Sequence, residues 1–285
     1  MKRIGVVAKT DRDEARIVIP QLLDWCAARG LAVVLEKETA GLCPDRATMA
    51  VLKPELPGQV DLLLVLGGDG TLLSMARLVG DLGVPILGVN LGGLGFLTAL
   101  TVEELFPALE ALLSGGLVIE ERMMLAARVF RQGERLGEYV ALNDVVITKS
   151  AMSRIINLEV AVEGEFATGY RADGLIVSTP TGSTAYCLSA GGPIVFPTMD
   201  AVVLTPICSH TLTNRPIVLP ASLSIEVKLL SDQDVMLTLD GQVGLALKRA
   251  DVVGIGPAAA RIRLLRPPQK HFLSVLRTKL KWGER

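Results

Sequence analysis

The feature that most constrains the fold is a short apolar run that ends in a glycine-rich turn. Residues 61–66 read Asp-Leu-Leu-Leu-Val-Leu and are followed by Gly67-Gly68-Asp69-Gly70-Thr71. A run that is apolar on both faces is typical of a strand buried in a parallel sheet. The turn then opens a predicted helix over residues 71–79. This pattern indicates a doubly wound α/β domain, Rossmann-like in type, in which helices cover both faces of a parallel sheet.

The rest of the first hundred residues continues this alternation. Strands are predicted at residues 3–8, 31–35 and 85–89, and helices over residues 13–29 and 102–114. In the first helix, Ile17, Leu22, Trp25 and Cys26 are expected to share one face, and Gly30 stands where a helix C-terminal glycine belongs. Thr101 and Glu104 form a capping-box pattern at the start of the second helix.

After residue 116 the chain changes to short runs of β-branched residues separated by turns. Strands are predicted at 125–130, 136–142, 145–148, 155–162, 166–170, 224–230, 235–239, 243–247, 252–255 and 261–265. This spacing indicates a β-rich second domain. We predict an α/β domain over residues 1–117, the β-rich domain over 118–266, and a terminal segment, 267–285, whose helix packs back on the first domain.

Composition and charge exclude several classes of protein. Half of the residues are hydrophobic, but the uncharged stretches 84–102 and 174–199 are broken by Gly, Pro, Ser, Thr and Asn, so no membrane-spanning helix is expected. The formal net charge of −1 gives no general basic field for nucleic acid. The first residues lead directly into a strand-like run without an apolar signal segment, which favours a cytoplasmic location.

Several catalytic motifs are absent from the sequence. No Gly-Lys dipeptide occurs, which excludes a Walker A loop, and neither a complete G-x-G-x-x-G nor a G-x-S-x-G is present. Four scattered cysteines and two histidines argue against a zinc site. His210 and His271 are therefore interpreted as structural residues.

The glycine-rich turn has two interpretations that the residues alone leave open. Glycines before a helix allow phosphate oxygens to approach backbone N–H groups, and the helix N-terminus favours negative charge. Asp69 would then hold Mg²⁺ or accept a proton from an attacking hydroxyl. Alternatively, Asp69-Gly70 is an ordinary turn, or Asp69 caps a helix.

A second candidate segment runs from Arg171 to Tyr186 and combines a strand with a loop of small hydroxyl residues. Such a loop offers hydroxyl and amide donors to ribose and phosphate, although a plain connector would have a similar composition. Taken alone, Asn143-Asp144 is an Asx turn or a ribose contact. Arg154 is a phosphate contact or a surface charge. The stretch 240–242, Asp-Gly-Gln, is typical of a hairpin turn.

In their order along the chain, these segments resemble the NAD kinases, the family that phosphorylates the adenosine 2′-hydroxyl of NAD to make NADP. The resemblance covers nearly the whole chain and rests on residues 67–71, 87–97, 143–144, 173–186, 189–193, 206–212 and 240–242. The turn at 67–71 is shared with lipid kinases and is similar to a phosphofructokinase motif, whereas the block from 173 to 193 is far more specific.

The resemblance implies a role for each matching residue. Asp69 would be the general base that takes the 2′-hydroxyl proton, and Gly67, Gly68, Gly70 and Thr71 would shape the phosphate turn. The NAD pocket in the β-rich domain would contain Asn143, Asp144, Arg154, Arg171, Asp173, Thr184, Ala185, Tyr186, Cys187, Leu188, Ser189 and Gln242. Two residues depart from the family pattern, since Asp144 stands where Glu is usual and Cys187 where Ser is common.

The resemblance also implies the partners and the assembly. ATP would be the phosphate donor, a divalent cation such as Mg²⁺ the cofactor, and a homodimer or homotetramer the assembly, with a cleft between the α/β domain and a β-sandwich-like domain. Two other functions stay open at this point. One is a lipid or sugar kinase that uses the same glycine-rich turn, and the other is a dinucleotide-binding sensor without catalysis.

Overall fold

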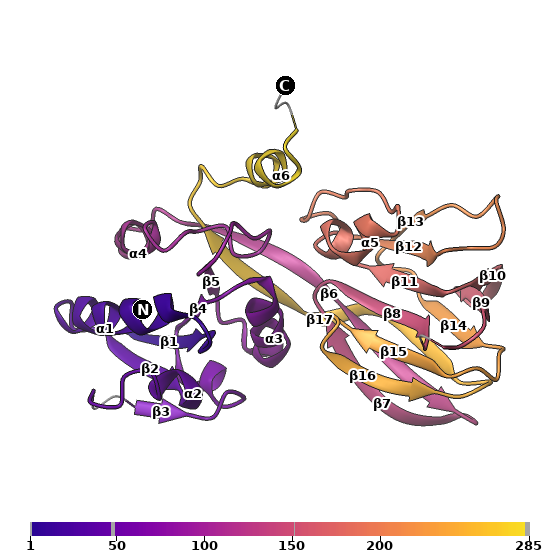
Figure 1. Cartoon of the computed structure of the whole chain (residues 1–285), viewed down its shortest axis with the longest axis horizontal. Helices are drawn as coiled ribbons and strands as arrows, with labels where there is room; N and C mark the ends of the chain where they lie inside the picture. The colour runs from indigo at the N-terminus through magenta and orange to yellow at the C-terminus, as the bar shows by residue number, and fades with distance from the viewer. Residues whose placement is uncertain (1, 47–48, 151, 283–285) are drawn as a thin grey trace. The chain divides into compact units, whose positions relative to one another are not determined.

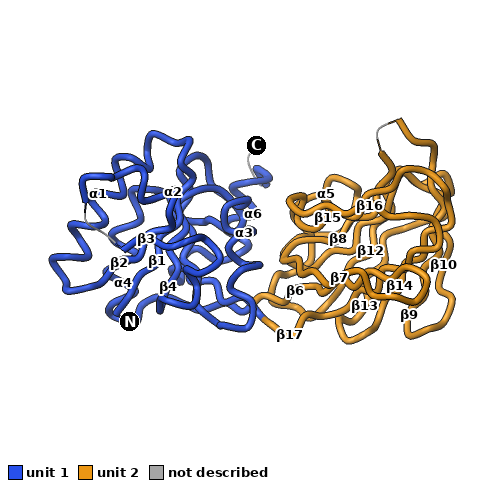
Figure 2. The backbone as a smooth tube through the Cα atoms, turned by 90° about the horizontal axis from the view of Figure 1, so that it is seen from below, with its two compact units in different colours: residues 1–121, 261–285 blue, residues 122–260 orange. Residues whose placement is uncertain are grey.

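The computed structural model describes residues 2–46, 49–150 and 152–282 and divides into two compact units. Unit 1 comprises residues 1–121 and 261–285, and unit 2 comprises residues 122–260 (Figure 2). Two long strands, β6 (Val118–Arg131) and β17 (Val252–Arg266), each begin in one unit and end in the other. Each unit has a hydrophobic core of its own.

Unit 1 contains a parallel sheet in the strand order β17-β5-β4-β1-β2-β3, drawn in indigo and violet up to β5 in Figure 1. Its strands are β1 (Arg3–Ala8), β2 (Ala32–Glu36), β3 (Met49–Val51), β4 (Leu62–Leu66), β5 (Ile86–Val89) and the C-terminal part of β17. All five residues of β4 are buried, as the apolar run predicts. The prediction of a doubly wound α/β fold is confirmed.

The helices before residue 121 follow the predicted alternation with small shifts, except that the short helix over residues 37–40 was not predicted. They are α1 (Asp13–Ala27), α2 (Lys37–Ala40), α3 (Asp69–Val79) and α4 (Leu105–Leu113), with single 3₁₀ turns at Leu56–Gln59 and Gly80–Leu82. The predicted face of α1 is wrong for Ile17, whose exposed fraction is 62%. Five residues along a helix turn the side chain about 140° from its starting direction, so Ile17 points away from the buried Leu22.

The start of α4 differs from the capping-box prediction. The Thr101 N–H donates to Glu104 Oε2 at 3.0 Å, so this half of the box forms. The helix nevertheless begins only at Leu105, because residues 102–104 form a turn.

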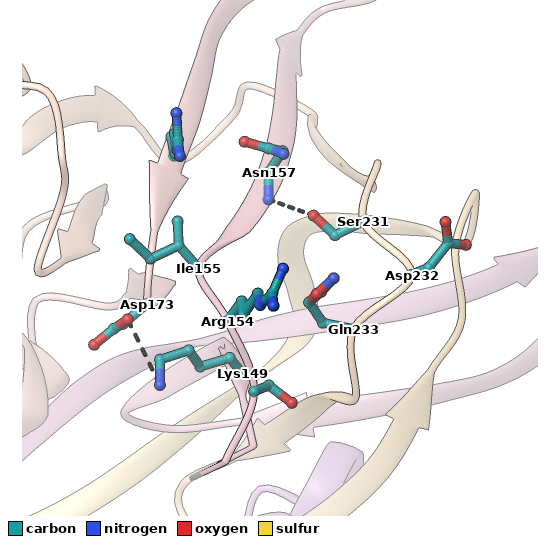
Figure 3. Close-up of a pocket in the computed structure, with 10 residues that line it drawn as sticks. Lys149, Arg154, Ile155, Asn157, Asp173, Ser231, Asp232 and Gln233 are labelled. Atoms are coloured by element: carbon teal, nitrogen blue, oxygen red, sulfur yellow. Dashed lines mark hydrogen bonds and ion pairs between the residues drawn. The ribbon is translucent and has the colours of Figure 1, made fainter.

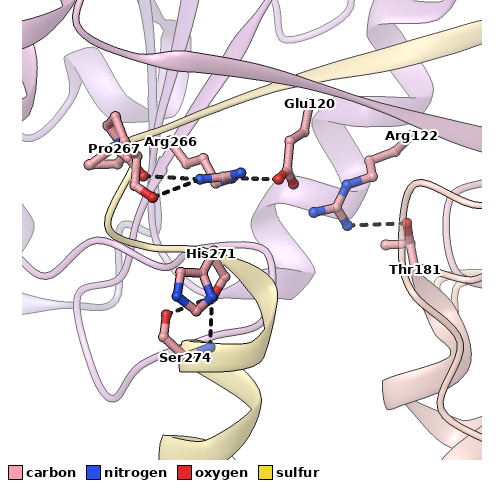
Figure 4. A network of polar contacts seen from close by, with 8 residues as sticks. Glu120, Arg122, Thr181, Arg266, Pro267, His271 and Ser274 are labelled. Atoms are coloured by element: carbon pink, nitrogen blue, oxygen red, sulfur yellow. Dashed lines mark hydrogen bonds and ion pairs between the residues drawn. The ribbon is translucent and has the colours of Figure 1, made fainter.

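The C-terminal segment belongs to unit 1 and ends in α6 (Phe272–Leu280). His271 caps this helix, since its Nδ1 accepts a hydrogen bond from the Ser274 N–H at 3.2 Å (Figure 4). At the end of β17, Arg266 pairs with Glu120. Beyond it, Lys270 Nζ lies 2.8 Å from Oε1 of Glu104, in the turn before α4. The interpretation of His271 as structural agrees with this geometry.

Unit 2 is built from two antiparallel layers. One is a six-stranded sheet in the order β13-β12-β11-β8-β15-β16, and the other contains β10, β9, β14 and the N-terminal part of β17, with β6 and β7 alongside. Their bounds are β7 (Glu134–Ala141), β8 (Asp144–Lys149), β9 (Ile156–Val162), β10 (Glu165–Ala172), β11 (Gly174–Ser178), β12 (Ala201–Ile207), β13 (Ile217–Pro220), β14 (Ile225–Leu229), β15 (Val235–Leu239) and β16 (Val243–Leu247). One core cluster takes buried residues from both layers, so the β-rich, sandwich-like prediction is confirmed.

Three tight turns connect neighbouring strands of this unit. Gln132-Gly133, Glu163-Gly164 and Asp240-Gly241 all have positive φ at both residues, the requirement of a type I′ hairpin turn. Strands β12 and β13 were not predicted, and β17 was predicted as two separate strands. Glycines at 254 and 256 favour a break, but pairing with β14 and β5 keeps that strand continuous.

Candidate active site

The glycine-rich turn occupies a position that the topology of unit 1 favours for ligands. Strand order reverses between β1 and β4, and ligands of open α/β sheets bind beyond the carboxyl ends of the strands at such a point. Gly67 and Gly68 follow β4, while Asp69, Gly70 and Thr71 form the first turn of α3. The Lys9 N–H, just beyond β1, donates to the Leu66 carbonyl at 2.8 Å and holds the two strand ends together.

Asp69 is half-buried, and its carboxylate holds a loop that follows β5. Oδ2 accepts the Phe96 N–H at 2.9 Å, and Oδ1 accepts the N–H groups of Leu97 at 3.1 Å and Thr98 at 3.0 Å. The Thr98 hydroxyl donates the fourth hydrogen bond to this carboxylate, at Oδ1 and 2.9 Å. The carboxylate is therefore fixed in direction by a segment 27 to 29 residues further along the chain.

Close approach explains two glycines of this region. A Cβ at Gly95 would lie 2.2 Å from Asp69 Oδ1, and a Cβ at Gly67 would lie 2.6 Å from Thr71 Oγ1. Gly95 therefore permits the loop to reach the carboxylate, and Gly67 lets the Thr71 side chain fold back over the turn.

The hydroxyl-rich loop of unit 2 follows β11 and includes a 3₁₀ turn (Gly182–Thr184) and the short helix α5 (Tyr186–Ser189). Hydroxyls at 178, 179 and 183 are buried and donate to backbone carbonyls, with Thr179 Oγ1 only 2.6 Å from the Leu142 carbonyl oxygen. Their hydrogens are used inside the protein, which differs from the expectation that they donate to a ligand. They make the loop rigid instead.

Asn143 and Asp144 lie at the start of β8, beside the end of β11. A Cβ at Gly182 would lie 2.1 Å from the Asn143 carbonyl oxygen, so the loop packs tightly on this pair. The side-chain oxygen Oδ1 of Asn143 is buried and has no hydrogen-bond partner among the described residues. It is therefore a buried acceptor that the described part of the chain leaves available at this end of β8.

A third carboxylate, that of Asp240, organises this pair. It accepts the N–H groups of Leu142 at 3.2 Å, Asn143 at 2.7 Å and Asp144 at 3.3 Å. Burial and, to a lesser extent, the nearby charge of Asp240 together raise the pKa of Asp144 to about 7. Asp144 is thus a carboxyl group that the fold holds near its titration point at neutral pH.

Four predicted residues near this end differ in exposure, since one is buried and three are exposed. Cys187 is fully buried, with its Sγ 3.3 Å from Thr205 Oγ1, and burial raises the pKa of its thiol. Its side chain therefore packs inside unit 2. Tyr186, Ser189 and Gln242 are exposed, and Gln242 closes the hairpin that begins at Leu239.

The other predicted residues gather at the opposite end of the same strand pair. Arg154, Arg171 and Asp173 line a cavity of about 820 Å³ together with Lys149 and Ser231 (Figure 3). Lys149 Nζ lies 3.8 Å from Asp173 Oδ1. The five residues of β11 span about 17 Å, so this cavity and the Asn143 end are separate places in unit 2.

Sequence reasoning missed three residues that the structure adds to these places. Thr98 holds Asp69, Asp240 holds the Asn143 turn, and Arg122, which is 7% exposed, donates to Thr181 Oγ1 at 3.4 Å (Figure 4). Asp240 stood in a predicted hairpin turn, within a segment that carries the resemblance, whereas Thr98 only follows the segment 87–97 and had no signal of its own.

Metal and membrane features can be stated for the described part of the chain. No group of three or more His, Cys, Asp or Glu side chains in residues 2–46, 49–150 and 152–282 is arranged to hold a metal ion. Over the same ranges, no helix is both long and apolar enough to cross a membrane.

Comparison with known proteins identifies the family. The model of the ATP-NAD kinase N-terminal domain matches residues 4–117, and that of the ATP-NAD kinase C-terminal domain matches residues 142–266. NAD kinases of Geobacter sulfurreducens and Syntrophotalea carbinolica are 51% and 52% identical, with each chain covered over 100% of its length.

Solved structures agree with these matches. A yeast NADH kinase complexed with NADH has a TM-score of 0.92 at 26% identity, with 100% of this chain and 89% of that chain covered. An NAD kinase from Archaeoglobus fulgidus in complex with ATP shares the fold, with a TM-score of 0.76 at 23% identity and coverage of 99% and 100%. Both halves of the chain thus fall in one class, the two-domain nucleotide kinases. The chain belongs to the NAD kinase family.

Proposed function

We propose that the chain transfers the γ-phosphate of ATP to the 2′-hydroxyl of the adenosine ribose of NAD, giving NADP and ADP. The observation that carries this function is the full-length match to relatives named NAD kinase at about half identity. The enzyme is then a phosphotransferase with an alcohol group as acceptor. The lipid- or sugar-kinase and sensor alternatives are not favoured by any of these relatives.

Asp69 is the general base in this proposal. Phosphoryl transfer requires mainly positioning and charge neutralisation, with one group to orient the nucleophile and take its proton. Support comes from the half-buried carboxylate at the strand-order reversal of unit 1 and from the four hydrogen bonds that fix its direction. Gly67, Gly68, Gly70 and Thr71 form the phosphate turn at the start of α3.

The remaining roles belong to the β-rich part of the chain. Asn143 and Asp144 bind NAD, and the pocket is completed by Arg154, Arg171, Asp173, Thr184, Ala185, Tyr186, Cys187, Leu188, Ser189 and Gln242. The buried, unpartnered Oδ1 of Asn143 supports a donor from the ligand at that position. For Cys187 the contact would come from the helix backbone, because the thiol is buried. The domain division 1–117, 118–266 and 267–285 is part of this proposal.

A divalent cation, Mg²⁺, is proposed as the cofactor. Mg²⁺ is usually held by substrate phosphates, water and one or two carboxylates rather than by a protein cage. Mg²⁺ bound to ATP would neutralise charge on the transferring phosphate, while the Gly67–Thr71 turn binds phosphate oxygens.

The proposed assembly is a homodimer or homotetramer in the cytoplasm, without nucleic-acid or membrane partners. The edge strand β13 supports self-association, since Ile217 and Val218 are 42% and 47% exposed on it. Analytical ultracentrifugation checks the assembly, and a monomer at micromolar concentration would contradict it.

An NADP-formation assay tests the function. The purified chain is given NAD or NADH with a panel of phosphate donors, with and without Mg²⁺, and NADP(H) is measured. ATP- and Mg²⁺-dependent NADP formation is expected. Tight NAD binding without transfer from any donor would support the sensor alternative, and turnover of a lipid but not NAD would support the lipid kinase.

A further inference from the structure

A chain of polar side chains ends on Asp69. Asn90 Nδ2 donates to Thr98 Oγ1 at 2.8 Å, and Thr98 Oγ1 lies 2.9 Å from Asp69 Oδ1. The direction of the first bond is fixed, because the Gly92 N–H donates to Asn90 Oδ1 at 2.8 Å. An N–H can only donate, so Asn90 presents its oxygen to Gly92 and its NH₂ to Thr98. The hydroxyl hydrogen of Thr98 is then left for the carboxylate.

This chain makes the two oxygens of Asp69 unequal. Oδ1 accepts three hydrogen bonds, from the Leu97 N–H, the Thr98 N–H and the Thr98 hydroxyl. A carboxylate oxygen offers roughly two lone-pair sites, so Oδ1 is saturated. From the described part of the chain, Oδ2 accepts a single hydrogen bond, that of the Phe96 N–H.

We propose that Oδ2 is the atom of Asp69 that takes the substrate proton, and that Thr98 and Asn90 are positioning residues that hold it in that role. The proposal rests on the proposed function of Asp69 as general base. The ribose 2′-hydroxyl gives its proton to Oδ2, and its oxygen forms a bond to the γ-phosphorus. The bond from that phosphorus to the β–γ bridging oxygen breaks, and its electron pair leaves with ADP.

Packing keeps the carboxylate from exchanging its two oxygens. Rotation about the Cβ–Cγ bond of Asp69 would break the three hydrogen bonds at Oδ1 together. Thr98 is fully buried, and a Cβ at Gly95 would lie 2.3 Å from Thr98 Oγ1 as well as 2.2 Å from Asp69 Oδ1. The arrangement is therefore set by the fold before substrate binds, as preorganised catalytic groups require.

Replacement of Thr98 directly tests this relay, the hydrogen-bonded series from Asn90 through Thr98 to Asp69. Thr98→Val keeps the shape of the side chain but cannot donate, so kcat is expected to fall roughly 10- to 100-fold while KM for NAD and ATP changes less than about threefold. Thr98→Ser restores the hydroxyl and should bring kcat back to within about threefold of the parent. An unchanged kcat in Thr98→Val would overturn the proposal, as would a Ser variant no better than Val.

A double-mutant cycle separates this proposal from the proposed function. If Thr98 acts through the Asp69 carboxylate, Thr98→Val should cause little further loss of kcat in an Asp69→Asn background. The same fold-loss in both backgrounds would overturn the relay and leave the general base intact. A parental kcat in Asp69→Asn alone would instead overturn the general-base role, and the proposal with it.

Asn90→Asp provides a second variant in case Thr98→Val does not fold. Aspartate keeps an acceptor for the Gly92 N–H, but its other oxygen would accept the Thr98 hydroxyl hydrogen and turn it away from Asp69. A loss of kcat similar to that of Thr98→Val is expected, with no further loss when both changes are combined. A kcat within about twofold of the parent would overturn the relay.

Discussion

Two Asp-Gly dipeptides, Asp69-Gly70 in unit 1 and Asp240-Gly241 in unit 2, carry out the same local task in different surroundings. Each carboxylate accepts the N–H groups of three successive residues in a distant segment. Asp69 stands half-buried at the head of a helix, whereas Asp240 is 9% exposed in a hairpin turn beside the buried Asp144. The same dipeptide thus has different surroundings in the two units: in unit 1 its carboxylate is the one proposed for reaction chemistry, and in unit 2 its carboxylate fixes a turn.

The largest expected effect is on catalysis at Asp69. Asp69→Asn removes the proton acceptor and should lower kcat roughly 10²- to 10⁴-fold, with a much smaller change in NAD affinity. Steady-state NADP formation and calorimetric NAD binding measure the two quantities. Asp81→Asn, at an exposed carboxylate of the same unit, is the matched control and should keep the parental kcat. Retained turnover in Asp69→Asn would contradict the general-base role.

The matching change in unit 2 should affect folding first. Asp240→Ala leaves three N–H groups of the β7–β8 turn without their acceptor and places alanine at a φ of 51°. A loss of about 3 kcal/mol in the free energy of unfolding is expected, measured by urea denaturation. Asp240→Asn retains one acceptor oxygen and tolerates positive φ, so its loss should be about 1 kcal/mol. Equal losses in both variants would show that the three hydrogen bonds to the Asp240 carboxylate do not stabilise the turn.

A smaller effect is expected from the glycine that lets a loop reach Asp69. Gly95→Ala would place its Cβ 2.2 Å from Asp69 Oδ1, so the loop must shift and stability should fall by roughly 1–3 kcal/mol. Gly93→Ala in the same loop meets no atom within 4 Å and is the matched control for stability. Thermal melting compares them, and equal melting temperatures would show that the contact at Gly95 has no energetic importance.

The smallest effect is a pH dependence from Asp144. Because burial raises its pKa to about 7, the folded state binds a proton more tightly than the unfolded state does. That contribution to stability is complete below the unfolded pKa, near 4, and is lost as pH rises through about 7. Asp144→Asn should therefore gain on the order of 1–2 kcal/mol relative to the parent between pH 6 and pH 8.

Urea denaturation at pH 6 and pH 8 checks this prediction. Identical pH dependence in the two proteins would place the titration elsewhere. The same experiment sharpens the comparison between the two units. Asp144 of unit 2 lies near a second carboxylate, that of Asp240, whereas Asp69 of unit 1 is surrounded by hydrogen-bond donors.

Short-range patterns gave the parts of the fold that depend on neighbours in sequence. The apolar run at residues 62–66 is the buried strand β4, and the hairpin turn predicted at residues 240–242 connects β15 to β16, with positive φ at Asp240 and Gly241. Strands β12 and β13 were not predicted. They lie in the layer order β13-β12-β11, where pairing with a neighbouring strand sets their limits more than local propensity does.

For the site, the sequence by itself determined that Asp69 lies between a buried strand and a helix, and that the chain resembles the NAD kinases. The tertiary structure decided what surrounds each carboxylate. Thr98 reaches Asp69 across 29 residues, and Asp240 reaches Asn143 across 97. Hydrogen bonds over such separations leave no periodic pattern in the sequence, because they depend on which segments the sheets bring side by side. Only the folded chain therefore distinguishes the carboxylate proposed for proton transfer from the one that fixes a turn.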